Sequence, residues 1–248
     1  MAGSKKPLLK VDLHTHTRED ATDQIAYSAR DLVQEASLRG YDALAITNHD
    51  TLTQSAALDS FAAERGVVLI PGVEVTISNK HVLLLNMPYE EGVYRSFEDI
   101  SHHKSANTLV MAPHPYFPGP TCLNGQLEAT PHLFDAVEYS HFYTDHLNFN
   151  RPALRFARKH GLPVVANSDA HVLEQFGLAY SLVEAEKTPG AIVQAIKAGR
   201  VQPVSQPLNL VNLMKIYVRI AVVKRFSWHR PLELTFTVAA LMKWFLKR

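Results

Sequence analysis

The stretch VDLHTHTRED, residues 11–20, carries the end of an apolar run directly into two histidines and a charged loop. The run begins at Leu8, and His14 and His16 follow it at alternate positions. Alternate side chains of an extended segment project to the same side, so the two imidazoles can bind one shared centre. Because neutral imidazole is the commonest metal-binding side chain, the stretch predicts a buried strand that ends in a metal site.

Seven further apolar runs are spaced along the chain, and stretches with helical periodicity separate most of them. The runs span residues 43–47, 67–77, 81–86, 108–112, 136–140, 163–168 and 179–185, and the helical stretches span 28–40, 51–66, 150–161 and 189–199. This alternation, with short connections, indicates an α/β fold with a parallel sheet covered by helices. Eight runs are too many for a small open sheet, so we expect a closed or nearly closed barrel with its chemistry at the carboxyl ends of the strands.

Histidines and carboxylates stand at the expected carboxyl ends of six of these strands. They are His14, His16, His49, Asp50, Glu74, His114, Glu138, His141, Asp169 and His171. In a barrel these side chains converge on one pocket. Their number exceeds the four ligands of one tetrahedral zinc site, and mixed imidazole and carboxylate ligands suit zinc, manganese or iron. We therefore expect two or three divalent ions that share a bridging carboxylate.

The composition is that of a globular protein with a full core, since 46% of the 248 residues are hydrophobic and 20% are charged. The single cysteine, Cys122, excludes an intramolecular disulfide framework and fits a reducing compartment. The start has no apolar segment of signal length, and no apolar run reaches 18 residues. We therefore expect a cytoplasmic protein.

Residues 208–248 differ in charge from the domain that we expect over residues 1–207. They hold eight Lys and Arg against one acid, Glu233, which gives +7, whereas the remainder has 17 basic and 23 acidic residues, which gives −6. Two apolar stretches here are interrupted by charge, so neither is expected to span a bilayer. We expect a helical extension that packs on the barrel, pairs with a second subunit, or lies on an anionic membrane surface with Trp228 and Trp244 near the headgroups. No stable nucleic-acid partner is expected, because aromatic residues do not alternate with the basic ones.

Four motifs resemble those of the PHP family, the polymerase and histidinol phosphatase superfamily. DLHTHT, ALAITNHDT, APHP and NSDAH stand in the family's order, and PGVEVT matches the glutamate segment between the second and third motifs. The resemblance covers residues 11–205. It implies a distorted seven-stranded, TIM-like β/α barrel that holds up to three zinc, manganese or iron ions and acts mainly on phosphate esters.

The resemblance also implies a set of metal ligands. They are His14, His16, Asp20, His49, Glu74, His114, His141, Asp169 and His171. Glu74 would bridge the first metal, held by the HxH pair and Asp169, to the second, held by His114. The third would take His49, His171 and an acid from the first loop.

Two of these ligand assignments have alternatives, and two further positions, His81 and Asn48, are expected to affect how the ligands are oriented. The acid of the first loop is Asp20 or Asp23, with Asp20 favoured on reach, and the ligand of the sixth segment is His141 or its competitor His146. His81 is expected to orient a ligand. The usual aspartate before the second-motif histidine is Asn48 here, which would weaken the orientation of His49 or the occupancy of the third metal.

The predicted activity is hydrolysis of a phosphate mono- or diester of a small metabolite or nucleotide. Divalent ions lower the pKa of a bound water to roughly 7 and so supply a hydroxide nucleophile. Glu74, Asp169 and His171 are the predicted catalytic residues, with His171 or a metal-bound water as the proton donor.

Substrate-binding residues are less well marked. Arg18 follows the HxH pair and is the predicted phosphate contact, and Lys104 is a second candidate. The rings of Tyr116 and Phe117, which follow the third motif, would stack on a base or sugar.

Two other functions fit the same residues. One is a metal-binding barrel without turnover that acts as a scaffold, for which Asn48 is the support. The other is an amidohydrolase-like enzyme that cleaves C–N or lactone bonds, because HxH on a first strand also opens those barrels. Such barrels usually carry a metal-bridging lysine at a strand end, and the sequence offers none there.

Overall fold

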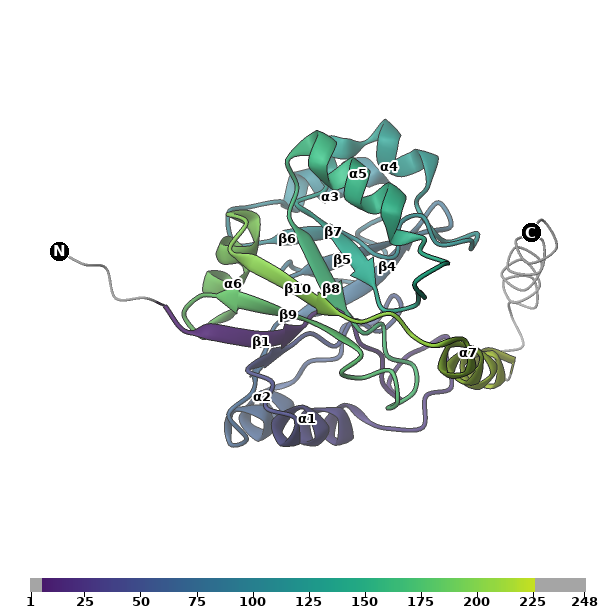
Figure 1. Ribbon diagram of the computed structural model, residues 1–248. Helices are drawn as coiled ribbons and strands as arrows, with labels where there is room; N and C mark the ends of the chain where they lie inside the picture. The colour runs from purple at the N-terminus through teal and green to yellow at the C-terminus, as the bar shows by residue number, and fades with distance from the viewer. Residues whose placement is uncertain (1–5, 226–248) are drawn as a thin grey trace.

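The computed structural model describes residues 6–225, which form a mixed α/β fold with two five-stranded sheets (Figure 1). The first sheet has the order β10-β9-β1-β2-β3 and the second the order β4-β5-β6-β7-β8. The strands are β1 (Leu8–Asp12), β2 (Ala43–Leu44), β3 (Val68–Leu69), β4 (Gly72–Ile77), β5 (Lys80–Leu85), β6 (Leu109–Ala112), β7 (Ala136–Ser140), β8 (Val164–Asn167), β9 (Ala179–Glu184) and β10 (Val201–Ser205). The helices are α1 (Ala29–Leu38), α2 (Ala56–Ala63), α3 (Phe97–His103), α4 (Gly125–Ala129), α5 (Asn150–His160), α6 (Pro189–Lys197) and α7 (Leu210–Arg225), with a 3₁₀ turn at Pro131–Leu133.

We expected a closed or nearly closed barrel with a parallel sheet, and the structure instead has two sheets of mixed strand direction. Four pairings are parallel, but β4 with β5, β5 with β6, β1 with β9 and β9 with β10 are antiparallel. The β4–β5 pair is a hairpin whose two turn residues, Ser78 and Asn79, have φ of 50° and 59°. Two positive φ angles are the mark of a tight two-residue hairpin turn, so the chain returns without a crossover helix. Pro71 separates β3 from β4, and these strands belong to different sheets.

The two sheets approach each other beyond the carboxyl ends of their strands. Thr15 forms a parallel bridge with Ala170, and His49 forms another with Glu74. The amide of Asp169 donates to the carbonyl of His14 at 2.9 Å. The motif-bearing strand ends therefore meet at one place, although the strands divide between two sheets.

The core has a layer between the sheets and a layer on each outer face. Strand β5 shows why, because Leu83 and Leu85 join the inner layer while Val82 and Leu84 join the outer one. A strand buried on both faces reads as a continuous apolar run, as this one does. Helices α3, α4 and α5 cover the outer face of the second sheet, and α1 and α2 cover that of the first (Figure 1).

Several predicted helix boundaries are confirmed by their caps. Ser28 caps α1 in a capping box with Asp31, and Gly40 follows that helix with φ of 68°. The stretch 51–66 becomes helical only at α2, because Ser55 is its N-cap. Thr188 caps α6 in the same way.

Helix α7 is the described part of the predicted C-terminal extension. Its buried residues Leu213 and Ile216 pack with Leu208 and with Phe142 from the loop after β7. Its opposite side exposes four apolar side chains, which are Leu210, Val211, Met214 and Val218. Within residues 6–225, no helix has the length and hydropathy needed to cross a bilayer. Contact of this segment with a membrane surface or second subunit stays a prediction, and Trp228 and Trp244 lie outside the described residues.

Candidate metal centre

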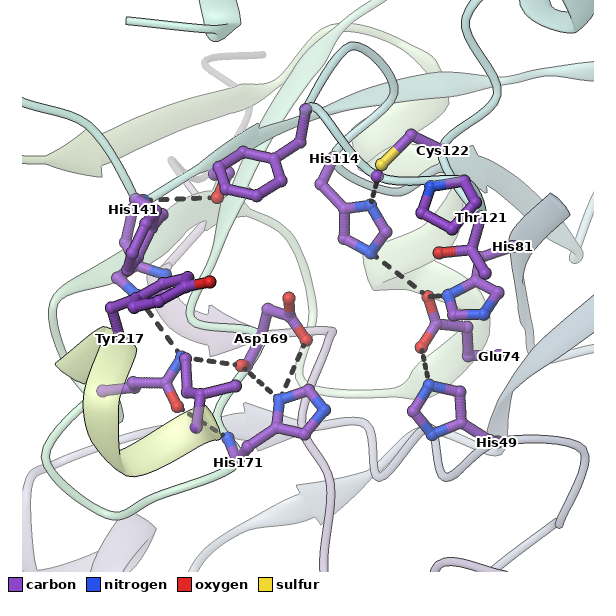
Figure 2. A pocket seen from close by; sticks show the side chains of 17 residues that line it. His49, Glu74, His81, His114, Thr121, Cys122, His141, Asp169, His171 and Tyr217 are labelled. Atoms are coloured by element: carbon purple, nitrogen blue, oxygen red, sulfur yellow. Dashed lines mark hydrogen bonds and ion pairs between the residues drawn. The ribbon is translucent and has the colours of Figure 1, made fainter. Parts of the chain in front are cut away.

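A cavity of about 140 Å³ lies where the strand ends meet, and it has two unlike sides (Figure 2). One side consists of metal-binding residue types, which are His49, Glu74, His81, His114, His141, Asp169 and His171. Glu74 and His81 lie within β4 and β5, and the other five side chains come from the loops that follow β2, β6, β7 and β8. The other side includes Phe117, Phe142, Tyr217 and Ile220.

His14 and His16 are fully buried behind the polar side, and their rings face each other. Nδ1 of His14 lies 2.9 Å from Glu138 Oε1, and Nδ1 of His16 lies 3.1 Å from Asp20 Oδ2. An ionised carboxylate can only accept, so each Nδ1 carries a proton and a neutral ring keeps its lone pair on Nε2. The two Nε2 atoms are 3.2 Å apart.

Two carboxylates complete this arrangement. Both Nε2 atoms lie 3.3 Å from Glu74 Oε2 and 3.3 Å from Asp169 Oδ1. Four electron-pair donors thus point at one spot, which is unfavourable unless a cation is present. The donor set of two imidazoles and two carboxylates fits a divalent metal ion.

Glu74 contacts more of the imidazoles than the other acidic residue of the cavity lining, Asp169. Its two carboxylate oxygens lie within 3.4 Å of nitrogens from five rings, which belong to His14, His16, His49, His81 and His114. Such a position suits a carboxylate that bridges ions, as we expected of Glu74. His81, which we expected to orient a ligand, lies 2.9 Å from Glu74 Oε1 and faces the cavity itself.

Four overlapping triplets in the described chain have ligand atoms within 4.8 Å of one another. They are His16–His49–His171, His14–Glu74–His114, His14–His16–Asp169 and His49–Glu74–His81. Seven of the nine predicted ligands occur in these triplets, and Asp20 and His141 do not. The overlap means that ions bound in neighbouring triplets would share ligands.

Asp20 takes a different place from the one we expected. Its Oδ2 accepts from the Nδ1 atoms of His16 and His49 at 3.1 and 2.9 Å, and its Oδ1 accepts from the backbone of Thr22 and Asp23. Both oxygens therefore serve protein donors, and Asp20 orients two imidazoles from behind. Asp23 is the acid that faces inward, with Oδ2 3.1 Å from His171 Nε2. The distance along the loop from the HxH pair, on which we favoured Asp20, does not determine which of the two acids faces inward.

Asn48 does not orient His49. Its side chain accepts from the Thr17 amide and donates to the hydroxyls of Thr17 and Thr53, which ties together the loops after β1 and β2. His49 is oriented by Asp20, whose Oδ2 accepts hydrogen bonds from the backbone amide and from Nδ1 of His49. The weakening of His49 that we expected from the missing aspartate has no basis in these contacts.

The structure separates the two candidates from the sixth segment. His141 is buried, lines the cavity and lies 3.4 Å from the Gln175 side-chain nitrogen, whereas His146 is exposed. Burial lowers the pKa of His141 to about 4, so the ring is neutral and keeps a lone pair near neutral pH.

The backbone turns sharply at two of the inward-facing residues. His114 and Asp169 have φ of 26° and 48°, in a region that residues other than glycine seldom adopt. The His114 amide donates to Glu138 Oε2 at 2.7 Å and the Asp169 amide to the His14 carbonyl, which holds both turns. Strain of this kind is concentrated at functional sites.

The site is strongly acidic before any cation binds. Burial opposes a charge on His14, but nearby carboxylates, Glu138 first among them, outweigh it and raise the pKa of His14 well above its usual value. Burial alone would raise the pKa of Glu74, yet the surrounding imidazoles, led by His81, hold that pKa well below its usual range. Burial lowers the pKa of His81 to about 4. Among the described residues no Lys or Arg lines the cavity, so protons or metal ions must balance the carboxylates.

The cations predicted to hold phosphate lie elsewhere. Arg18 is exposed and its guanidinium donates to the carbonyl of Ala26, outside the cavity lining. Lys104 pairs with Asp135 at 2.9 Å. Of the two aromatic candidates Phe117 lines the cavity, whereas the hydroxyl of Tyr116 donates to Glu128.

Sequence reasoning missed the α7 contribution to the cavity. Tyr217 and Ile220 line it, and Figure 2 shows the Tyr217 ring reaching in from α7 near His141. No motif marks these residues. The apolar character of residues 208–225 predicted a packed helix but did not identify the surface on which it packs.

Comparisons with known proteins agree with this geometry. The family model described as PHP-associated matches residues 148–201. A two-domain protein from Bacteroides vulgatus that contains a predicted PHP-like metal-dependent phosphoesterase superimposes with a TM-score of 0.62 at 17% identity, covering 86% of this chain and 70% of that one. These likenesses support the resemblance to the PHP superfamily.

Other solved structures and one relative are also similar to this chain. PsfC from Pseudomonas syringae has a TM-score of 0.59 at 18% identity and covers 88% of this chain and 98% of its own. The lesion-specific endonuclease PfuEndoQ from Pyrococcus furiosus has a TM-score of 0.51 at 16% identity, covering 85% and 66%. An uncharacterized protein of Methanocaldococcus jannaschii, MJ1587, is 28% identical over 120 residues, which are 44% of this chain and 70% of that protein. Likenesses at this identity establish the fold, and the activity must be argued from the site.

Proposed function

We propose that this protein is a member of the PHP superfamily and a metal-dependent hydrolase that cleaves a phosphate mono- or diester of a small metabolite or nucleotide. The observation that carries the proposal is the position of Glu74, whose two oxygens face five imidazoles on one side of an accessible cavity. The fold shared with a predicted PHP-like metal-dependent phosphoesterase supports the same reaction class.

We assign two or three divalent ions, of zinc, manganese or iron, to the triplets around Glu74. When bound, such ions supply a nucleophilic water at neutral pH and neutralise the charge on the phosphoryl oxygens. His14, His16 and Asp169 would hold one ion together with Oε2 of Glu74. His81 and His114 lie next to the other carboxylate oxygen of Glu74, Oε1. His49 and His171 meet His16 on the remaining side.

The protein's own contribution is to orient these ligands and to move a proton. Glu138 and Asp20 hold the Nδ1 protons of His14 and His16, which keeps both Nε2 lone pairs directed inward. His171 donates from Nδ1 to the Asp169 carbonyl, and its Nε2 lies 3.1 Å from Asp23. In the two-ion form, in which His171 binds no metal, we assign to its Nε2, supported by Asp23, the delivery of a proton to the leaving oxygen.

The test compares two histidine variants of protein purified without chelator. Wild-type protein should carry at least two metal equivalents and release phosphate from members of a phosphoester panel. His14→Ala should lose metal and activity, whereas His146→Ala, at an exposed site, should retain both. Full activity of His14→Ala would show that the centre is not catalytic, and one metal equivalent or none in the wild type would overturn the multi-ion assignment.

Amides and lactones belong in the same panel, because an amidohydrolase from Chromobacterium violaceum has a similar fold, with a TM-score of 0.52 at 16% identity, covering 77% of this chain and 97% of that one. The absence of lysine from the described cavity lining favours esters of phosphate. The scaffold hypothesis loses its support, because Asn48 bonds away from His49.

A further inference from the structure

The apolar side of the cavity is formed by side chains that pack against one another. Phe142 lies between Phe117 and Tyr217, with ring centroids 5.5 and 6.3 Å away. Helix α7, which supplies Tyr217 and Ile220, is anchored beneath them by Leu213 and Ile216, whose side chains are buried. Four apolar side chains from three segments of the chain thus face the metal-binding residues across the cavity.

Two of the polar side chains beside this surface, Gln175 and Ser140, already make hydrogen bonds within the protein. The oxygen of the Gln175 side chain accepts from the amides of His171 and Val172, and its nitrogen donates to the Asp169 carbonyl. Ser140 Oγ accepts from the Phe142 amide. A sugar or another polyol placed here would replace only part of its bonds to water, and each hydroxyl left without a partner would cost roughly 1–3 kcal/mol. An apolar group would meet no such penalty.

The charge distribution points the same way. Among the described lining residues the acidic groups, Glu74 and Asp169, belong to the metal-binding side, and no Lys or Arg is present. Phosphate would therefore be bound from the metal side alone, and the remainder of the ester would face Phe117, Phe142, Tyr217 and Ile220.

We propose that the substrate is a phosphoester of an apolar alcohol, whose aromatic or aliphatic part is held between α7 and the loops after β6 and β7. This inference rests on the proposed phosphoesterase activity and narrows its substrate class. Phe117, Phe142, Tyr217 and Ile220 would then determine specificity, while the histidines and carboxylates opposite perform the chemistry.

The test uses two esters with similar alkoxide leaving groups, 2-phenylethyl phosphate and glycerol 3-phosphate. Wild-type protein should hydrolyse the phenylethyl ester with a kcat/KM at least roughly 10-fold higher, which is the size of discrimination that an apolar pocket provides. Phe117→Ala and Tyr217→Ala should raise KM for the phenylethyl ester by about 10-fold and change the glycerol ester less than about 2-fold. Phe61→Ala on α2, in another part of the core, is the matched control and should alter neither.

A second measurement uses only the wild-type protein, so it does not depend on whether the variants fold. Phenylethylphosphonate should inhibit the wild-type protein at least roughly 10-fold more tightly than ethylphosphonate, because only the former fills the apolar side. Equal hydrolysis of both esters, or equal inhibition by both phosphonates, would overturn this inference and leave the phosphoesterase activity standing. Failure of metal-loaded protein to hydrolyse any ester of the panel would overturn the proposed function, and this inference with it.

Discussion

The two sides of the cavity differ in how the chain builds them. The metal side consists of short motifs at strand ends, and each motif places its side chain by local geometry. The apolar side gathers Phe117, Phe142 and two residues of α7 from segments that carry no motif. The metal-binding residue types are thus placed locally, whereas the apolar side depends on which surface α7 covers.

The largest expected effect comes from the carboxylate at the centre of the metal side. Glu74→Gln removes one oxygen from among five imidazoles, so at least one metal equivalent should be lost. Activity should fall by at least roughly 10³-fold, beyond the 10–100-fold typical of residues that only orient ligands. Metal content and kcat/KM measure this, with exposed Glu64→Gln as the control. Unchanged metal content would break the assignment of Glu74 as a bridge.

A smaller effect on the same side should follow Asp20→Asn. The amide cannot accept from His16 and His49 and also from the loop backbone, so one set of donors is left unpaired. Metal affinity should drop by about 10–100-fold without loss of stoichiometry at saturating metal. Titration with zinc or manganese tests this, and the exposed Asp145→Asn should bind like the wild type. A lost equivalent at saturation would instead make Asp20 a ligand.

A substitution on the apolar side should lower the free energy of unfolding. Leu213→Ala removes a buried side chain that anchors α7, and the unfolding free energy should fall by about 2–5 kcal/mol. Metal content should not change, because no metal-binding residue lies on α7. Leu210→Ala, on the exposed face of the same helix, should change stability by less than about 0.5 kcal/mol. Denaturant unfolding distinguishes the two, and equal stability of both variants would contradict the packing of α7.

The smallest effect is expected from Arg18→Ala. The Arg18 side chain bonds to the Ala26 carbonyl at the surface and does not reach the cavity. Steady-state kinetics with the phenylethyl ester should show KM changed by less than about 2-fold. A KM increase of 10-fold or more would restore Arg18 as the phosphate contact and place the substrate outside the cavity described above.

The sequence predicted that these histidines and carboxylates come together, because HxH pairs and acids that follow apolar runs have a spacing that extended backbone converts directly into position. It did not predict the division into two sheets, since the turn at Ser78 and Asn79 carries no glycine to mark it. It left Asp20 and Asp23 undecided, because a loop can present either acid inward. Helix α7 is apolar on more than one face, so its sequence did not identify which face packs against Phe142.

The place where the two sheets meet has a consequence for how the protein holds together. His14, His16 and His49 extend from the first sheet, whereas Glu74, His114 and Asp169 extend from the second. Any ion bound between them would act as a cross-link, and at a thousandfold excess over its Kd it would add about 4 kcal/mol to stability. The supply of metal in the surroundings would thus govern how long the folded chain survives, as well as whether it turns over substrate.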